Sequence, residues 1–169
     1  MFRNASKSLT TTDEVYEYAL GLLDRREHGE KELAQKLKRR CSSDRLVREV
    51  INKLKAYDLI NEERYANSVF EAWRGKKIYG RLHLRAELVK KQVDDRIISS
   101  ILAKLSEEEE ISRVEAAYRQ IALRQDKKYD CSTENGVAAL VRYFSARGFG
   151  PSMIRVGLAR AKEDLNTLS

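Results

Sequence analysis

The stretch "LAQKLKRRCSSDRLVREVINKL", residues 33–54, carries the pattern that decides the fold of this chain. Ser43 in its middle is a favourable helix N-cap, so the stretch is predicted to form two helices joined by a short turn. Leu33 and Leu37 mark the inner face of the first helix. The second helix has one apolar stripe at helical spacing, formed by Leu46, Val47, Val50, Ile51 and Leu54.

The same apolar pattern returns twice further along the chain. The counterparts of Leu33 and Leu37 are Leu84 and Leu88 in one copy, and Leu140 and Phe144 in the other. The counterparts of the second-helix stripe are Ile97, Ile98, Ile101, Leu102 and Leu105, and then Met153, Ile154 and Leu158. A register that is kept across two helices and the turn between them indicates an internal repeat.

Helix start signals cover the rest of the chain. Thr11 and Glu14 form a capping box that opens a helix to about Arg26, and the second helix is expected over 30–40. Further helices are expected to start after Asn61, Gly80, Asp94, Ser106, Thr133 and Gly150. The 8 glycines and the single proline are too few for the turns of a sandwich or barrel.

We therefore predict an all-α protein made of three tandem three-helix repeat units packed into one elongated, curved body. The units are predicted over residues 13–60, 61–105 and 106–165, after a flexible N-terminus of residues 1–12. A single unit is too small to bury much core alone, so we expect neighbouring units to pack on one another.

The charge balance is basic, with 33 Lys and Arg against 26 Asp and Glu, a net charge of +7. This balance favours polyanions or acidic protein surfaces as partners. Cys41 and Cys131 have neither metal-ligand spacing nor a disulfide framework, and we interpret them as reduced thiols. The N-terminus lacks the apolar core of a signal peptide and no run is long enough to span a membrane, so we expect a cytoplasmic protein without a membrane partner.

No catalytic motif emerges from the sequence. His28 and His83 are the two histidines, and neither has a Cys or an acid at zinc spacing. The "GKK" at 75–77 lacks the spacing of a phosphate-binding loop, and Asp94 with Asp95 is explained by helix capping. We predict a protein that is not an enzyme and that uses no cofactor or metal.

The most basic stretch is "RGKKIYGRLHLRAELVKK", residues 74–91, in which Glu87 is the only acid. Lys90 and Lys91 suit the negative end of a helix dipole, whereas cations near the start of a helix do not. We predict a contact surface for a partner or DNA, formed by Arg74, Lys76, Lys77, Tyr79, Arg81, Arg85, Lys90 and Lys91. The helix after Gly80 also has a second apolar row, predicted to be packed, formed by Leu82, Ala86 and Val89.

Four segments resemble the RecX family of bacterial regulators of the RecA recombinase. They are "RREHGEKEL" at 25–33, "LINEERYA" at 59–66, "GRLHLRAEL" at 80–88 and "RYFSARGF" at 142–149. The resemblance implies a curved all-helical protein that binds the RecA–DNA filament and inhibits its recombinase, ATPase and co-protease activities. The chain departs from the family at Arg81, where a proline is usual, and at Cys41 and Gln92, where a glycine is usual.

The partner that the resemblance implies is the RecA filament, and we expect a monomer that also contacts the phosphates of single- or double-stranded DNA. The alternative is a direct DNA-binding protein of helix-turn-helix type, built from 30–40 and 44–57, without a RecA partner. Its recognition face would be Arg45, Arg48, Asn52 and Lys55, mixed with Asp44 and Glu49. An enzyme would need a metal-dependent activity that no motif predicts.

Overall fold

The computed structural model describes residues 8–167, and the side chains of residues 8–163. This part of the chain is helical throughout and contains no strand, so the predicted all-α class is confirmed. The elements in order are α1 Thr12–Leu23, α2 Glu30–Lys38, α3 Asp44–Ala56, α4 Glu62–Gly75, α5 Arg81–Lys90, α6 Asp95–Ala103, α7 Glu107–Ala122, the short 3₁₀ helix η1 Lys127–Tyr129, α8 Glu134–Ser145 and α9 Pro151–Thr167.

The predicted helix starts are confirmed. Thr11 and Glu14 form the capping box, in which each side chain accepts a hydrogen bond from the backbone of the other. Side chains also cap the helices at Ser43, Asn61, Asp94, Ser106 and Thr133. Two helix ends differ from the prediction, because α1 ends at Leu23 and α2 at Lys38, before Arg26 and Arg40.

The terminus expected to be flexible falls partly outside the described residues. Residues 1–7 of this terminus are outside the described range. Within the described part, the Leu9 amide donates to the Arg40 carbonyl at 2.7 Å, and Thr12 is already helical.

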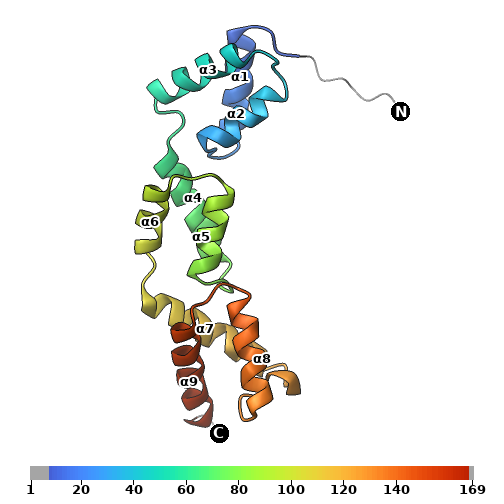
Figure 1. The fold of residues 1–169 in the computed structure, drawn as a ribbon, viewed down its shortest axis with the longest axis vertical. Helices are drawn as coiled ribbons and strands as arrows, with labels where there is room; N and C mark the ends of the chain where they lie inside the picture. The colour runs from blue at the N-terminus through green and yellow to red at the C-terminus, as the bar shows by residue number, and fades with distance from the viewer. Residues whose placement is uncertain (1–7, 168–169) are drawn as a thin grey trace, which may run out of the picture.

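The helices form three groups of three that follow one another along an elongated, curved body (Figure 1). In each group the third helix packs on the other two: α3 on α1 and α2, α6 on α4 and α5, and α9 on α7 and α8. We call these groups the first, second and third units. None of the helices in the described range is long and apolar enough to cross a membrane.

Each unit has its own apolar core. The core of the first unit is built around Leu33, Leu37 and Leu54, and that of the second around Trp73, Leu84 and Leu88. The core of the third unit contains Leu140, Phe144, Phe149 and Ile154. Neighbouring units do contact one another, but each core is enclosed by the three helices of its own unit, so the joints between units are largely polar.

A glycine positions the second unit against the third. Gly148, in the turn after α8, has a φ of +80°, and a Cβ at this position would lie 2.3 Å from the His83 amide nitrogen. Only glycine fits both the left-handed backbone and this close approach. Gln92 occupies the corresponding place after α5 with a φ of 60°. The left-handed backbone conformation that favours glycine is therefore present there, although the residue is not glycine.

Candidate interaction surface on the second unit

The basic stretch is divided between a bend and a helix. The last turn of α4 carries Arg74, and Lys76 is its C-cap. Lys77 follows in the left-handed region with a φ of 53°, which turns the chain toward Tyr79 and the start of α5. The eight predicted site residues therefore point in different directions, and each has its own surroundings.

Arg81 is bound at the joint between the second and third units. Its Nε donates to Glu110 Oε2 at 2.9 Å and its Nη1 to the Leu102 carbonyl at 2.9 Å. Its Nη2 donates to the Leu105 carbonyl. Glu110 lies on α7 with only 4% of its side chain exposed, so this is a largely buried ion pair. Arg81 fastens two units together.

The third unit also caps the start of α5. Gly80, the N-cap residue, offers no side chain, and a helix start leaves its first amides without internal partners. The Arg81 amide donates to Glu110 Oε1 at 2.8 Å, and the Leu82 amide donates to the Gly148 carbonyl at 2.9 Å. A carboxylate at this position also complements the positive end of the helix. A proline at position 81 could not donate the bond that Arg81 makes.

Arg74 makes a second ion pair at the same joint. Its Nε and Nη2 donate to the two carboxylate oxygens of Glu109, both at 3.0 Å. Arg113 adds a bond from Nη2 to the Arg74 carbonyl at 2.9 Å, and its guanidinium lies 4.4 Å from the centre of the Trp73 ring. Burial opposes the ionisation of Glu109, but the bonds from Arg74 and Arg113 outweigh it and lower its pKa.

Three of the predicted lysines line a cavity between the first and second units. The cavity has a volume of about 580 Å³ and is bordered by Lys76, Lys90 and Lys91 together with Glu32 and Glu87. Lys76 Nζ lies 3.5 Å from Glu87, which compensates its charge in part. Lys91 lies over the Tyr65 ring at 5.9 Å from its centre. The structure thus brings these three lysines together, beside two carboxylates.

Tyr79 does not stand open as a platform for a base. Its ring is partly buried against the core of the second unit and stacks on His83 at 3.9 Å between ring centres. The turn before α5 folds this ring onto the helix, so Tyr79 is engaged inside the second unit. His83 Nδ1 has no hydrogen-bond partner.

Lys77, Arg85 and Lys90 remain as outward cations. Their side chains are exposed, and within the described residues none of them makes a hydrogen bond or ion pair. The predicted second packed row of α5 is wrong in the structure: Leu82 is 57% exposed and Val89 is 48% exposed. Only Leu84 and Leu88 of this helix enter the core.

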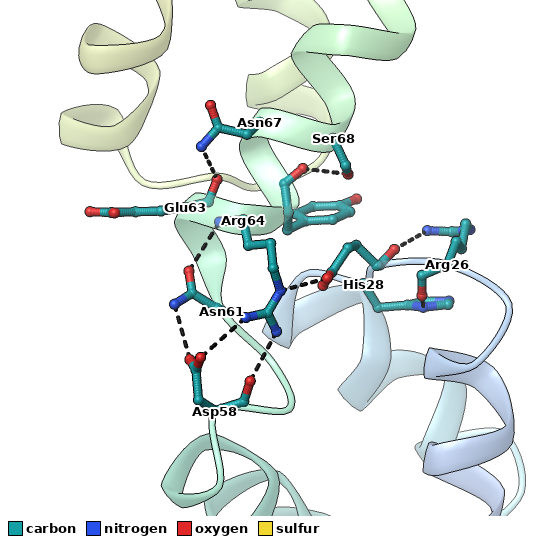
Figure 2. A network of polar contacts seen from close by, with 10 residues as sticks. Arg26, His28, Asp58, Asn61, Glu63, Arg64, Asn67 and Ser68 are labelled. Atoms are coloured by element: carbon teal, nitrogen blue, oxygen red, sulfur yellow. Dashed lines mark hydrogen bonds and ion pairs between the residues drawn. The ribbon is translucent and has the colours of Figure 1, made fainter.

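The joint between the first and second units depends on residues that the sequence did not single out. Figure 2 shows Arg64 of α4 close to Asp58 in the preceding loop, with Asn61 bonded to the same carboxylate. Arg64 Nε also donates to Glu27 of the first unit at 2.5 Å. The only sequence signal for this contact is the position of Asn61 as an N-cap, which fixes where α4 begins.

Glu32 is the second anchor of this joint. It accepts bonds from Arg26 Nη2 at 2.5 Å and from the Tyr65 hydroxyl at 2.9 Å. Burial by itself would raise the pKa of Glu32, but the bonds from Arg26 and Tyr65 lower it to about 2. Burial and the bond to Glu32 raise the pKa of Tyr65 to about 12. A phenol–carboxylate contact therefore joins α4 to α2 across the unit boundary.

The fold and this surface define an all-helical repeat protein whose candidate site is a surface for contacts rather than a cluster of catalytic groups. No group of three or more His, Cys, Asp or Glu within the described ranges could hold a metal ion. Residues 16–54 match the family model described as RecX, first three-helix domain.

Similarity to known proteins extends beyond this first unit. The regulatory protein RecX of Pseudomonas entomophila (strain L48) is 32% identical over 149 residues, which is 88% of this chain and 92% of that protein. The chain belongs to the RecX family. The regulatory protein RecX of Caldanaerobacter subterraneus subsp. tengcongensis is 32% identical over 136 residues, or 80% of this chain. The chain spans only 64% of the length of that relative.

The fold is shared with a solved structure as well. The crystal structure of RecX from Lactobacillus salivarius aligns with a TM-score of 0.79 at 23% identity, over 89% of this chain and 96% of that chain. The sequence relatives confirm the predicted family, and this structural similarity confirms the predicted fold of three-helix units. The relatives are named regulatory proteins, which agrees with a regulatory rather than a catalytic role.

Proposed function

We propose that this protein is a non-enzymatic regulator that binds the RecA–DNA filament in the cytoplasm as a monomer. Binding would reduce the ATPase, strand-exchange and co-protease activities of RecA, in recombinational repair and the SOS response. The observation that carries the proposal is the similarity to a RecX regulatory protein over 92% of its length and 88% of this chain, which is enough to reach into all three units. The elongated body suits a partner that is itself extended (Figure 1).

The contact surface is proposed to centre on Lys77, Arg85 and Lys90. Arg74 and Arg81 are less suited, because Glu109 and Glu110 already compensate their charges. Lys76, Tyr79 and Lys91 have internal partners too, and they would contribute at the edge of the surface. Cations without internal partners can bind anionic groups of the filament with little reorganisation, and such contacts weaken as the salt concentration rises.

Direct readout of duplex DNA by α3 has less support. Lys55 Nζ is bound to Glu30 at 2.7 Å, and Lys53 lies 4.3 Å from the centre of the Tyr16 ring. A recognition helix needs free side chains at its groove-facing positions. The remaining exposed face of α3 alternates basic residues with Glu49, which phosphate would repel.

The test is a titration of the protein into RecA, single-stranded DNA and ATP. ATP hydrolysis and strand exchange should slow at well below one molecule of protein per nucleotide. The control is binding to naked single- and double-stranded DNA at several salt concentrations. If neither activity changes while filaments are shown to be present, the proposal fails. Tight, sequence-dependent binding to naked duplex would favour the helix-turn-helix alternative instead.

A charge-reversal variant tests the surface. Replacement of Lys77, Arg85 and Lys90 by Glu should weaken inhibition by at least about tenfold, since three free cations become anions. A matched control reverses three exposed cations of the third unit, Arg124, Lys127 and Lys128, with the same change in net charge. Equal loss in both variants would show that total charge matters and that the surface on the second unit does not.

A further inference from the structure

The outward side of α5 carries an apolar ridge. Leu82, Ala86 and Val89 are spaced by four and three residues, so they lie above one another on one side of the helix. All three are exposed, and Leu82 and Val89 are 57% and 48% exposed. The core of the second unit lies on the other side, where Leu84 and Leu88 are fully buried. Folding of this chain therefore leaves the ridge uncovered.

Two cations border this ridge. With 100° between successive residues, Arg85 projects roughly 70° to one side of the ridge and Lys90 roughly 70° to the other. Neither side chain has an ion pair or hydrogen bond among the described residues. The one acid of α5, Glu87, points away from the ridge toward Lys76 at 3.5 Å. The outward face of α5 thus has an apolar centre, a positive charge on each side and no negative charge.

The neighbouring carboxylates are already engaged. Ala86 and Lys90 also border the cavity between the first and second units, where Glu32 and Glu87 lie. Glu32 is bound by Arg26, and Glu87 pairs with Lys76. Arg85 and Lys90 therefore remain available to anions from outside the molecule.

A nucleic acid satisfies only half of this pattern. Phosphates would bind Arg85 and Lys90, but a sugar–phosphate backbone offers no apolar surface for Leu82 and Val89. The ridge has no aromatic ring on which a base could stack. An apolar groove of a protein with carboxylates on both edges would cover the ridge and neutralise both cations.

A second copy of this chain offers one such groove, through contact of the second unit of one copy with the first unit of another. The groove lies on the first unit, has a volume of about 690 Å³, and combines Leu20, Leu23 and Leu59 with Glu17 and Asp24. Such contacts can close into a symmetric dimer or a ring, or continue as an open chain, and each of these assemblies would make sedimentation depend on protein concentration. The proposed function already requires a separate partner protein, and a second copy is the alternative that sedimentation tests.

We propose that the outward face of α5, formed by Leu82, Arg85, Ala86, Val89 and Lys90, docks into an apolar groove of a partner protein whose edges carry Asp or Glu. The inference rests on the proposed function, in which the partner is the protein component of the recombinase–DNA filament. It adds that α5 contacts the protein rather than the DNA. The ridge supplies the apolar contact, and the two cations fix its orientation.

The experiment compares binding to preformed filament with binding to naked single-stranded DNA. The variant Leu82→Ser/Val89→Ser removes the ridge, and Arg85→Gln/Lys90→Gln removes its cations. Leu123→Ser and Arg142→Gln are matched controls, because Leu123 is 76% exposed and Arg142 is exposed, both on the third unit. All substitutions are on exposed side chains, and circular dichroism with Trp73 fluorescence verifies folding.

We expect each double variant to bind filament at least about tenfold more weakly than the parent, with unchanged binding to naked DNA and unchanged controls. If the ridge variant binds filament as well as the parent does, the proposal that α5 docks on the partner is refuted, and the proposed function stands. If the parent does not bind filament, both fail. If the variants lose binding to naked DNA as much as binding to filament, α5 contacts nucleic acid instead. If the sedimentation of the parent depends on its concentration and that of the ridge variant does not, α5 contacts a second copy of the chain instead.

Discussion

Replacement of Arg81 by Met is expected to weaken the joint between the second and third units. The variant leaves the Glu110 carboxylate, 4% exposed, with a backbone donor but no cation, and it removes the donor to the Leu105 carbonyl. Loss of one partner of a buried ion pair costs about 3–5 kcal/mol. Because the Arg81 side chain is 33% exposed, we expect the lower end of that range, about 3 kcal/mol.

The assay is urea denaturation followed by the fluorescence of Trp73. This is the only tryptophan of the chain, and it lies at the same joint beneath Arg113. With a urea dependence of about 2 kcal/mol per molar, a loss of about 3 kcal/mol lowers the midpoint by about 1.5 M. The double variant Arg81→Met/Glu110→Leu should lose less than the sum of the two single variants, by at least about 1 kcal/mol, because it leaves no unpaired charge.

The control for this prediction is Arg85→Met, one turn later on the same helix. Arg85 is exposed and unpaired, so its replacement should change the free energy of unfolding by less than about 0.5 kcal/mol. If Arg81→Met and Arg85→Met lower the midpoint equally, or if the two single variants at the joint are additive, the Arg81–Glu110 pair does not hold the units together and the reasoning is refuted.

Two further predictions concern glycine and pH. Gly148→Ala should lower the free energy of unfolding by more than about 1 kcal/mol, because Gly148 has a φ of +80° and lies close to His83. Gly21→Ala should raise it by up to about 1 kcal/mol, because Gly21 lies inside α1 with open space around it. Calorimetry that finds the same sign of change for both variants contradicts this prediction. Since folding lowers the pKa of Glu32 from 4.5 to about 2, its contribution is present above pH 4.5 and is lost as the pH falls toward 2. Glu32→Gln should therefore make the urea midpoint depend less on pH between pH 5 and pH 2. If the midpoint of the variant falls with pH as steeply as that of the parent, Glu32 does not make this contribution.

The polar joints suggest why the candidate surface was only partly predictable. The sequence singled out Arg81 because a cation at the start of a helix is unfavourable there. The structure supplies the compensation in Glu110 of the next unit. Glu109 and Glu110 lie in the first turn of their own helix, where acids suit the helix dipole, and the sequence predicted that Arg74 and Arg81 contact a partner or DNA. Each half of the network had an explanation that did not involve the other.

The row of Leu82, Ala86 and Val89 illustrates a second limit. Its periodicity correctly marks an apolar side of α5, but periodicity does not identify what covers that side. Within this chain the row is exposed, so its apolar character is not explained by the core. Tyr79 illustrates the same limit, because its loop position in the sequence does not reveal that its ring stacks on His83.

The sequence by itself determined the helices and their grouping into three units, because capping and apolar spacing act over one or two turns of the chain. Thr11, Ser43 and Asn61 cap helices through contacts of three residues in sequence. Only the tertiary structure decided which cations are free. Arg81 meets Glu110 across 29 residues and Arg74 meets Glu109 across 35. Such pairs depend on how one folded unit is oriented on the next, and local pattern carries no information about that orientation.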